Sequence, residues 1–304
     1  MAAIIDTGLL TKGLRSEFFN RFEAVPVHFR DLATRVASTT DRENYKWLGT
    51  VPQMREWGTG RLAKGLRTES YSVENLKYEA TLEVDRDEIA DDQTGQIRLR
   101  IGELAERAAT HKDYLISQLL ILGESTGLAY DNVAFFSASH LSGDSGAQSN
   151  LLTFDAGSAD DPTVDEFKAA LKQSLAAMIA FKDDQGEPML TGASGLVCVV
   201  PPGMLFTALE ALNATVINST SNVLSGVARV ITLPWLTDAS KWYLLKTDSF
   251  LRPFIFQDRE PVEFNALTDS SDDGFKREKY LYGVRARYCM TYGYWQYAVR
   301  TDFV

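Results

Sequence analysis

The sequence predicts a mixed α+β fold. Three observations support this prediction: a long amphipathic pattern at residues 93–124, an alternation of helical and strand patterns at about 160–248, and a run of aromatic, β-prone segments from residue 250 onward. At 304 residues the chain is long enough to bury a sizeable core, and one or two domains are expected.

The first expected element is an amphipathic helix over residues 8–24. Apolar residues recur there four positions apart, with one more beside them, as in Leu10, Leu14, Phe18, Phe19 and Phe22. Pro26 ends the pattern, because proline cannot continue a helix interior. No helix follows directly in the sequence, so this apolar face has to pack against a more distant part of the chain or another molecule.

An irregular segment follows, YKWLGTVPQMREWGTGR at residues 45–61. It contains Trp47 and Trp57 among four glycine or proline positions, which is too many for a core helix. Two tryptophans are costly to leave in water, so they need a surface to cover them. Residues 70–86 then alternate apolar and charged side chains and predict a half-buried strand.

Residues 93–124 carry the strongest helical signal, and such a helix would be about 40 Å long. Asp91 and Asp92 precede it, where negative charge favours a helix N-terminus, and Gly123 follows its end. Its expected inner stripe consists of Ile97, Ile101, Leu104, Ala108, Leu115, Leu119 and Leu122.

Residues 125–162 have loop composition, and a second helix is expected after them. Thr163 and Glu166 have the spacing of a capping box at its start. A buried strand is expected at 195–202, a short helix at Met204–Leu212, and further short strands up to residue 248. From residue 250 the chain reads as strands broken by glycines.

The composition and motifs of the chain argue against an enzyme. The net charge of −10 argues against a broad basic nucleic-acid surface but allows a local basic patch. The two cysteines, Cys198 and Cys289, lie in apolar surroundings typical of buried reduced thiols. The start of the chain does not have the pattern of a secretory signal, and no apolar run is long enough to span a membrane.

Candidate sites for metals, cofactors or catalysis are weak. His28, His111 and His140 share no metal-ligand spacing, and His111 is expected on the polar side of the long helix. The acidic segment 269–274 imitates part of a calcium loop, but Tyr280 occupies the position where a glutamate is required, so a solvated acidic turn is expected. The sequence therefore predicts no catalytic residue, no cofactor and no metal.

Several stretches, in this order along the chain, resemble the major head proteins of Mu-like phages and prophages, which have the Hong Kong 97-type capsid fold. The matching stretches are YKWLGTVPQMREWGTGR, YSVENLKYEATLEVDRDEIADDQTG, AYDNVAFFSASH, RPFIFQDREPVEF and DDGFKREKYLYGVRARYCMTYGYWQYAV. The resemblance spans nearly the whole chain and is weakest in the middle region.

This resemblance implies a division of the chain. It implies an N-terminal arm at 1–40, an extended hairpin loop at 41–85, a peripheral domain at 86–159 with a spine helix at 93–124, an axial α/β domain at 160–248, and return strands of the peripheral domain at 249–304. It also implies a major capsid protein that self-assembles into hexamers and pentamers of an icosahedral shell around double-stranded DNA.

Two intersubunit surfaces follow from the resemblance. Aromatic anchors surrounded by polar residues are typical of interface hot spots. The expected loop contacts are Trp47, Pro52, Arg55, Glu56, Trp57, Arg61 and Lys64; the expected arm contacts are Leu14, Phe18, Phe19 and Phe22. Two alternatives stay open: the tryptophans pack beneath their own loop, and the phenylalanines pack on the chain's own spine helix.

The implied partners are other copies of the chain, a scaffold, a maturation protease, a portal and a decoration protein, with assembly in the bacterial host cytoplasm and no membrane. Packaged DNA is expected to make weak, non-specific contact, through basic residues of the arm such as Lys12, Arg15 and Arg21. The alternatives are a nanocompartment shell of the same fold and a soluble oligomeric enzyme, for which His140, Asp131 and Asp144 are the least poor candidates.

Overall fold

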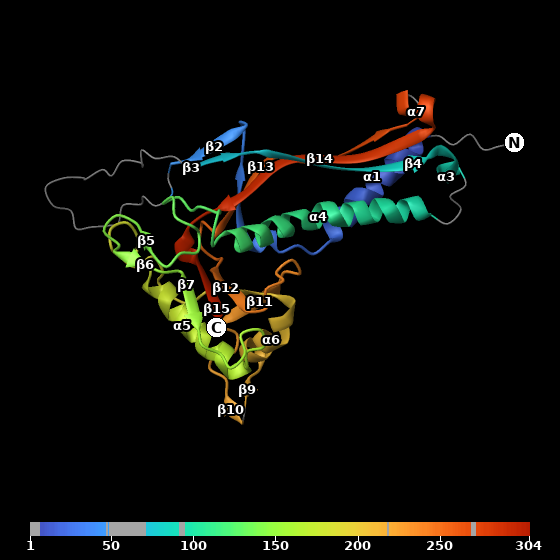
Figure 1. The fold of residues 1–304 in the computed structure, drawn as a ribbon. Coiled ribbons are helices and arrows are strands. Elements are labelled where there is room, and N and C mark those ends of the chain that lie inside the picture. Colours follow the sequence, from blue (N-terminus) through green and yellow to red (C-terminus); the bar gives the residue numbers. More distant parts are fainter. Residues whose placement is uncertain (1–6, 47, 49–70, 91–94, 218, 269–271) are drawn as a thin grey trace.

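The computed structural model describes residues 7–46, 48, 71–90, 95–217, 219–268 and 272–304. Figure 1 shows two bodies joined at an angle. In the upper body the long helix α4 (Gln96–Leu122) lies beneath long strands, and the lower body narrows to the hairpin of β9 (Val216–Ile217) and β10 (Thr220–Ser221). The mixed α+β fold expected from the sequence is confirmed.

A four-stranded sheet forms the upper body, in the order β1-β13-β14-β4. Its strands are β1 (Ala33–Ala37), β13 (Phe254–Leu267), β14 (Lys279–Tyr292) and β4 (Leu76–Asp85). β1 runs parallel to β13, and the other pairs are antiparallel. Along β4 the predicted alternation holds in part, since Tyr78, Leu82 and Val84 are covered whereas the charged residues between them are exposed.

Two helices pack on this sheet. α1 (Thr7–Ala24) and α4 lie against each other and against the sheet, and both match helices predicted from the sequence. Phe18 from α1, Ile101 from α4 and Phe264 from β13 are all buried in one apolar cluster. Burying each such large apolar side chain contributes about 1.5–3 kcal/mol, which fixes α1 to the upper body.

The buried face of α4 differs from the predicted stripe. Ile97 and Ile101 are buried as expected, but Leu122 is 43% exposed. The buried positions also include Ala105, Ala109, Asp113, Ile116, Ser117 and Leu120. The buried face is wider than predicted because α1 covers α4 on one side and β14 and β4 cover it on another. Small residues such as Ala105 and Ala109 allow this close packing. The predicted capping residues Asp91 and Asp92 lie outside the described residues.

The lower body has a five-stranded sheet in the order β11-β8-β12-β15-β7. The strands are β7 (Leu151–Phe154), β8 (Leu196–Val200), β11 (Ala228–Thr232), β12 (Lys241–Lys246) and β15 (Ala298–Phe303). Two helices pack on it, α5 (Val164–Ala180) and α6 (Leu205–Asn213). Every residue of β8 is buried, as its uniformly apolar sequence predicts.

The capping box of α5 is confirmed. Thr163 Oγ1 accepts a hydrogen bond from the backbone N–H of Glu166 at 3.3 Å, and the Thr163 backbone N–H donates to Glu166 Oε2 at 2.7 Å. Two backbone donors that the helix leaves unpaired are satisfied in this way.

Two strands of the lower sheet come from outside the range 160–248 expected for this part. β7 precedes that range, and β15 pairs with both β12 and β7. The sequence suggested loop structure for β7 and a place in the upper body for β15. Both strands are short, and only their long-range pairing reveals which sheet they join.

The remaining elements are short. They are α2 (Phe29–Leu32), β2 (Arg42–Tyr45), β3 (Tyr71–Glu74), α3 (Arg86–Ala90), β5 (His140–Leu141), β6 (Ala147–Gln148), η1 (Pro202–Met204), α7 (Asp272–Arg277) and η2 (Trp295–Tyr297). Among the helices of the described residues, none combines the length and the apolar character that crossing a bilayer requires.

Candidate assembly interface

The base of the predicted extended loop is fixed to the upper body. Tyr45 and Tyr71 face each other at the end of the β2–β3 pair, so the chain leaves and returns at one place. The Tyr45 hydroxyl donates to Gln257 Oε1 at 2.8 Å, and the Tyr71 hydroxyl lies 2.6 Å from Thr291 Oγ1. Burial raises the pKa of both tyrosines, as expected for hydroxyls enclosed in protein.

Below this base, a polar network continues into the sheet. Gln257 is fully buried and donates from Nε2 to Asn75 Oδ1 at 2.8 Å, and Asn75 donates to Ser38 Oγ at 2.8 Å. Because buried amides tolerate only a few arrangements that satisfy their hydrogen bonds, the network holds Ser38 and Asn75 in place against β13. The predicted contacts of the loop itself, Trp47, Pro52, Arg55, Glu56, Trp57, Arg61 and Lys64, lie outside the described residues.

The predicted arm contacts divide into two pairs. Leu14 and Phe18 are buried in the chain's own core, and the Phe18 ring lies 5.2 Å from that of Phe264. Leu14 and Phe18 therefore pack within the chain itself, which is one of the two alternatives that the sequence left open. Phe19 and Phe22 are only partly buried beside them. Contact of Phe19 and Phe22 with a neighbour stays a prediction.

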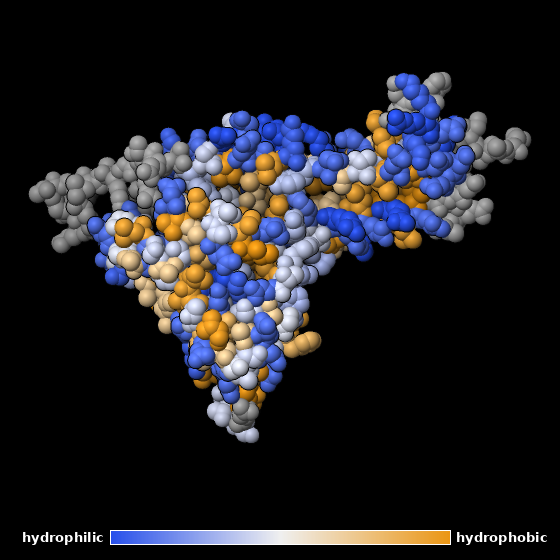
Figure 2. Space-filling view, viewed as in Figure 1, coloured by the Kyte–Doolittle hydropathy of each residue, from blue (hydrophilic) through white to orange (hydrophobic). Residues whose placement is uncertain are grey.

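Apolar side chains are exposed toward the tip of the lower body. Phe206 on α6 is 79% exposed, Val216 on β9 is 59% exposed, and Val223, shortly after β10, is 77% exposed. Figure 2 shows apolar residues scattered over the lower body, whereas hydrophilic residues line the upper edge. These three large apolar side chains are candidates for a surface that another molecule covers.

His140 has a structural environment. The imidazole is fully buried and stacks on Trp295, with ring centroids 4.1 Å apart and planes 7° from parallel. Its Nδ1 lies 2.7 Å from Asp131 Oδ2, and its Nε2 lies 3.2 Å from Asn150 Oδ1. Asp144, the third residue considered for a catalytic site, is exposed and is not part of this cluster. Its backbone N–H donates a hydrogen bond to the carbonyl oxygen of Asp184 at 3.1 Å. The cluster satisfies its own polar atoms and is closed to substrate.

His111 is not on a polar face, contrary to the sequence prediction. It is half-buried between α4 and the sheet, and its Nδ1 lies 2.7 Å from the Tyr288 hydroxyl. Desolvation lowers the pKa of His111, and the positive charge of Lys112 lowers it further. The predicted apolar stripe misplaced His111 because the sheet also covers part of the helix surface beside that stripe.

The acidic segment at 269–274 is described only from residue 272, where α7 begins. Within the described part of the chain, no three histidine, cysteine, aspartate or glutamate side chains are arranged to hold a metal ion.

The sequence analysis did not single out a basic pocket beside α2. Its cavity of about 570 Å³ is lined by side chains from α2, β1, α4, β13 and the loop at 249–252, among them Arg30, Arg35, Lys112 and Arg252. Because these basic residues come from three distant stretches of the sequence, no local motif marks them.

Relatives of this chain are capsid proteins. It is 25% identical over 287 residues to the Mu-like prophage FluMu major head subunit of Haemophilus influenzae, and 25% identical over 286 residues to the major capsid protein of Escherichia phage Mu. Each alignment covers 94% of this chain and 70% of the relative.

The fold is similar to that of a capsid protein in the solved procapsid of bacteriophage JBD30. That match has a TM-score of 0.57 at 24% identity and covers 97% of this chain and 76% of the other. A further structure shows the JBD30 capsid decorated with minor capsid protein trimers; its match has a TM-score of 0.55 at 22% identity, over 77% of this chain and all of the other.

The sequence also matches one protein family over residues 8–163, 163–236 and 237–302, which together span almost the entire chain. That match removes the enzyme and nanocompartment alternatives, and the chain belongs to the family of the Mu-like prophage major head subunit gpT, a structural protein of the virion that forms the icosahedral capsid.

Proposed function

We propose that this subunit forms hexamers and pentamers of the shell around double-stranded DNA, with the two bodies in different roles. The upper body, with most of residues 86–159 and most of 249–304, acts as a peripheral domain around its spine helix. The lower body, residues 160–248 together with β7 and β15, acts as an axial domain that meets its equivalents at the centre of a capsomer. Residues 1–40 form an arm and residues 41–85 an extended loop.

The fixed base of the loop is the observation that carries this proposal. Tyr45 and Tyr71 are tied to Gln257 and Thr291 by short hydrogen bonds, so the chain between them starts and ends at a rigid support. A rigid support suits a loop that has to find a precise position on a neighbour, because less conformational entropy is lost on binding. Trp47 and Trp57 then serve as its apolar anchors.

The exposed side chains Phe206, Val216 and Val223 support contact between lower bodies. In a ring of identical subunits each copy presents the same patch to the next, so one small apolar surface is used repeatedly. Covering these residues removes their apolar area from water, which stabilises the ring by about 25 cal/mol for each Å² buried.

The other partners follow from assembly. A scaffold, a maturation protease and a portal act during shell construction in the bacterial host cytoplasm, and a decoration protein binds afterwards, as the trimers do on the JBD30 capsid. Packaged DNA makes only weak, non-specific contact, because the chain as a whole carries a net charge of −10.

Electron microscopy of the purified protein, together with its elution volume on a sizing column, tests this proposal. Rings of five or six subunits, or closed icosahedral shells, are expected. A uniform dimer or tetramer that never assembles, at any salt or protein concentration, would refute the proposed assembly.

A further inference from the structure

The basic pocket beside α2 contains an ammonium group without a carboxylate partner. Lys112 Nζ lies 4.9 Å from the ring centroid of Phe29, 5.0 Å from that of Phe256 and 5.4 Å from that of Tyr288. Within the described residues it forms no ion pair. Burial lowers the pKa of Lys112, the negative charge of Asp258 offsets part of this decrease, and the positive charges of Arg30 and Arg35 lower the pKa further. The aromatic faces stabilise the cation only partly.

Both carboxylates close to Lys112 are already engaged. Asp258 pairs with Arg35, whose Nη2 lies 2.6 Å from Asp258 Oδ2. Asp113 accepts hydrogen bonds from the backbone N–H groups of His28 at 2.9 Å and Phe29 at 2.7 Å. The pocket therefore has four basic side chains against one lining carboxylate, although the chain as a whole is acidic.

The mouth of this pocket combines charge with exposed apolar surface. Arg30 and Arg35 are exposed at its edge, and Phe250, also part of the lining, is 98% exposed. A phenylalanine so fully exposed beside two arginines has the composition of an interface in which a partner covers the ring and pairs with the cations.

We propose that the pocket formed around Lys112, Arg30, Arg35 and Phe250 receives an acidic side chain of a second copy of this chain. Charge complementarity favours this occupant, since each copy has 41 acidic residues against 31 basic ones and the pocket is basic. The inference rests on the proposed shell assembly and names one contact within it.

The geometry favours a protein carboxylate over the phosphates of packaged DNA. Lys112 is recessed among aromatic rings, whereas contacts with the DNA backbone come from side chains that project from a surface. A glutamate or aspartate on a neighbouring chain can enter such a cavity, and its flanking residues can cover Phe250. The partly desolvated ammonium then gains a charge-assisted hydrogen bond, which is stronger than a neutral one.

Zero-length carbodiimide crosslinking tests the contact directly, because it joins an amine and a carboxylate only when they touch. Shells are assembled from an equal mixture of natural-isotope and ¹⁵N-labelled subunits, treated with the reagent, and analysed by mass spectrometry. The expected product is a Lys112 peptide joined to an aspartate or glutamate peptide carrying the other isotope label. Crosslinks of Lys112 only within one label, as to Asp258 or Asp113, or none at all, would overturn the inference.

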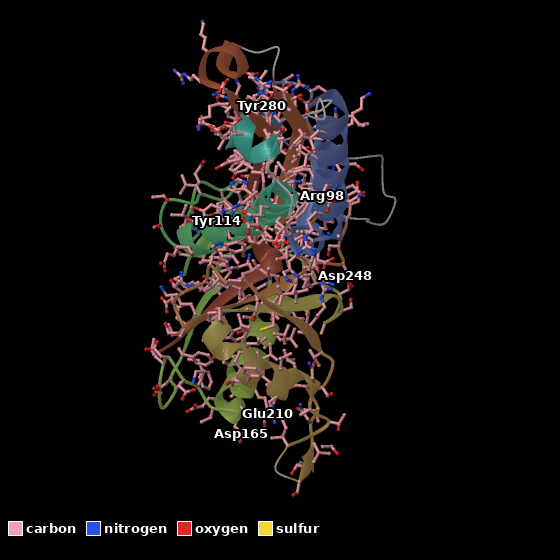
Figure 3. The ribbon with its side chains drawn as sticks, turned by 90° about the vertical axis from the view of Figure 1, so that its right-hand side faces the viewer. Arg98, Tyr114, Asp165, Glu210, Asp248 and Tyr280 are labelled. Atoms are coloured by element: carbon pink, nitrogen blue, oxygen red, sulfur yellow. The ribbon has the colours of Figure 1, made fainter. Side chains whose placement is uncertain are left out.

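Two variants complete the test. Lys112→Met keeps the apolar stem of the side chain and removes its charge; we expect a folded subunit with a marked loss of assembled shells. Arg98→Met removes an exposed charge of α4 outside the pocket, and we expect shells at the unsubstituted yield (Figure 3 labels Arg98 in the upper body, above Asp165 and Glu210 of the lower body).

The outcomes separate the two proposals. Failure of the unsubstituted protein to form shells contradicts the proposed assembly. Normal shells from Lys112→Met contradict only the pocket contact. If Lys112→Met unfolds, the isotope-mixed crosslink on the unsubstituted protein still decides the question.

Discussion

The guanidinium of Arg300, on β15 of the lower body, is paired with the carboxylate of Glu124, which follows α4 of the upper body. Arg300 is also held in the lower sheet by Asp302, with Nε 2.6 Å from Oδ1 and Nη2 2.7 Å from Oδ2. Its side chain is only 2% exposed. One buried cation thus joins the end of the long helix to the last strand of the other body.

We expect Arg300→Met to destabilise the subunit by about 3 kcal/mol, near the lower end for breaking a buried ion pair. We expect a loss near the lower end of this range because the Glu124 side chain is 38% exposed, so water can solvate its carboxylate once Arg300 is replaced. Denaturant unfolding measures the change. Lys241→Met is the matched control, since Lys241 contacts the same Glu124 at 3.6 Å but is 26% exposed, and it should cost less than about 1 kcal/mol.

His111 predicts a dependence of stability on pH. Its pKa is lowered in the folded chain by desolvation, so between the folded value and the ordinary value of 6.5 the unfolded chain binds the extra proton. Stability is therefore full above pH 6.5 and falls as the pH drops from there toward the folded pKa. Replacing His111 by Gln should flatten the unfolding free energy between pH 7 and pH 5; an unchanged slope would contradict the assignment.

His140→Ala should destabilise the subunit by about 1–3 kcal/mol, because the Asp131 carboxylate, 3% exposed, loses a hydrogen-bond partner inside the protein. Asp144→Asn, at an exposed site, should be neutral within about 0.5 kcal/mol. Thermal unfolding of both variants measures the contrast. Equal stabilities would mean that the buried cluster around His140 is not part of the folding core.

Replacement of Phe18 and Phe19 by Ala should have different effects. Phe18→Ala leaves a cavity in the upper core and should cost about 3–5 kcal/mol of folding free energy. Phe19 is partly buried, so Phe19→Ala should lower the folding free energy by less than Phe18→Ala. If a neighbouring subunit covers the Phe19 ring, this variant should instead reduce the yield of shells. Unfolding curves and electron microscopy of the same preparations separate the two effects; normal shells from a folded Phe19→Ala subunit would remove this residue from the interface.

Trp57→Ala is predicted to leave the subunit folded and to abolish or greatly reduce closed shells, because an interface anchor is lost. Circular dichroism checks the fold and sedimentation checks the assembly. Intact shells from Trp57→Ala would favour the alternative in which the tryptophans pack beneath their own loop.

Elements with a strong local signal were predictable from the sequence. α5 has its capping box at Thr163 and Glu166, and β8 is apolar throughout. The outline of α4 was also predictable, but its buried face was not. Asp113 lies on that face because its carboxylate accepts the N–H groups of His28 and Phe29, which are 85 and 84 residues away. No spacing rule within one helix detects such a partner.

The same limit applies to the candidate sites. The pocket around Lys112 joins residues from five segments, and β7 and β15 join the lower sheet from opposite sides of its main sequence range. Long-range pairing of this kind depends on which strand edges and helix faces are still uncovered after the local elements have formed. The local pattern of one sequence does not contain that information. The family resemblance identified the protein class because it draws on many positions at once.

The position of β15 in the lower sheet has a consequence for biosynthesis. β15 lies between β12 and β7, yet it follows both of them in the chain. While a ribosome is still translating, β12 and β7 lack the strand that belongs between them, and the lower sheet stays open until Phe303 has emerged. Domains of nascent chains fold as units. A chain truncated before β15 therefore lacks the strand that joins β12 to β7, and we expect it not to offer a finished lower body to other copies.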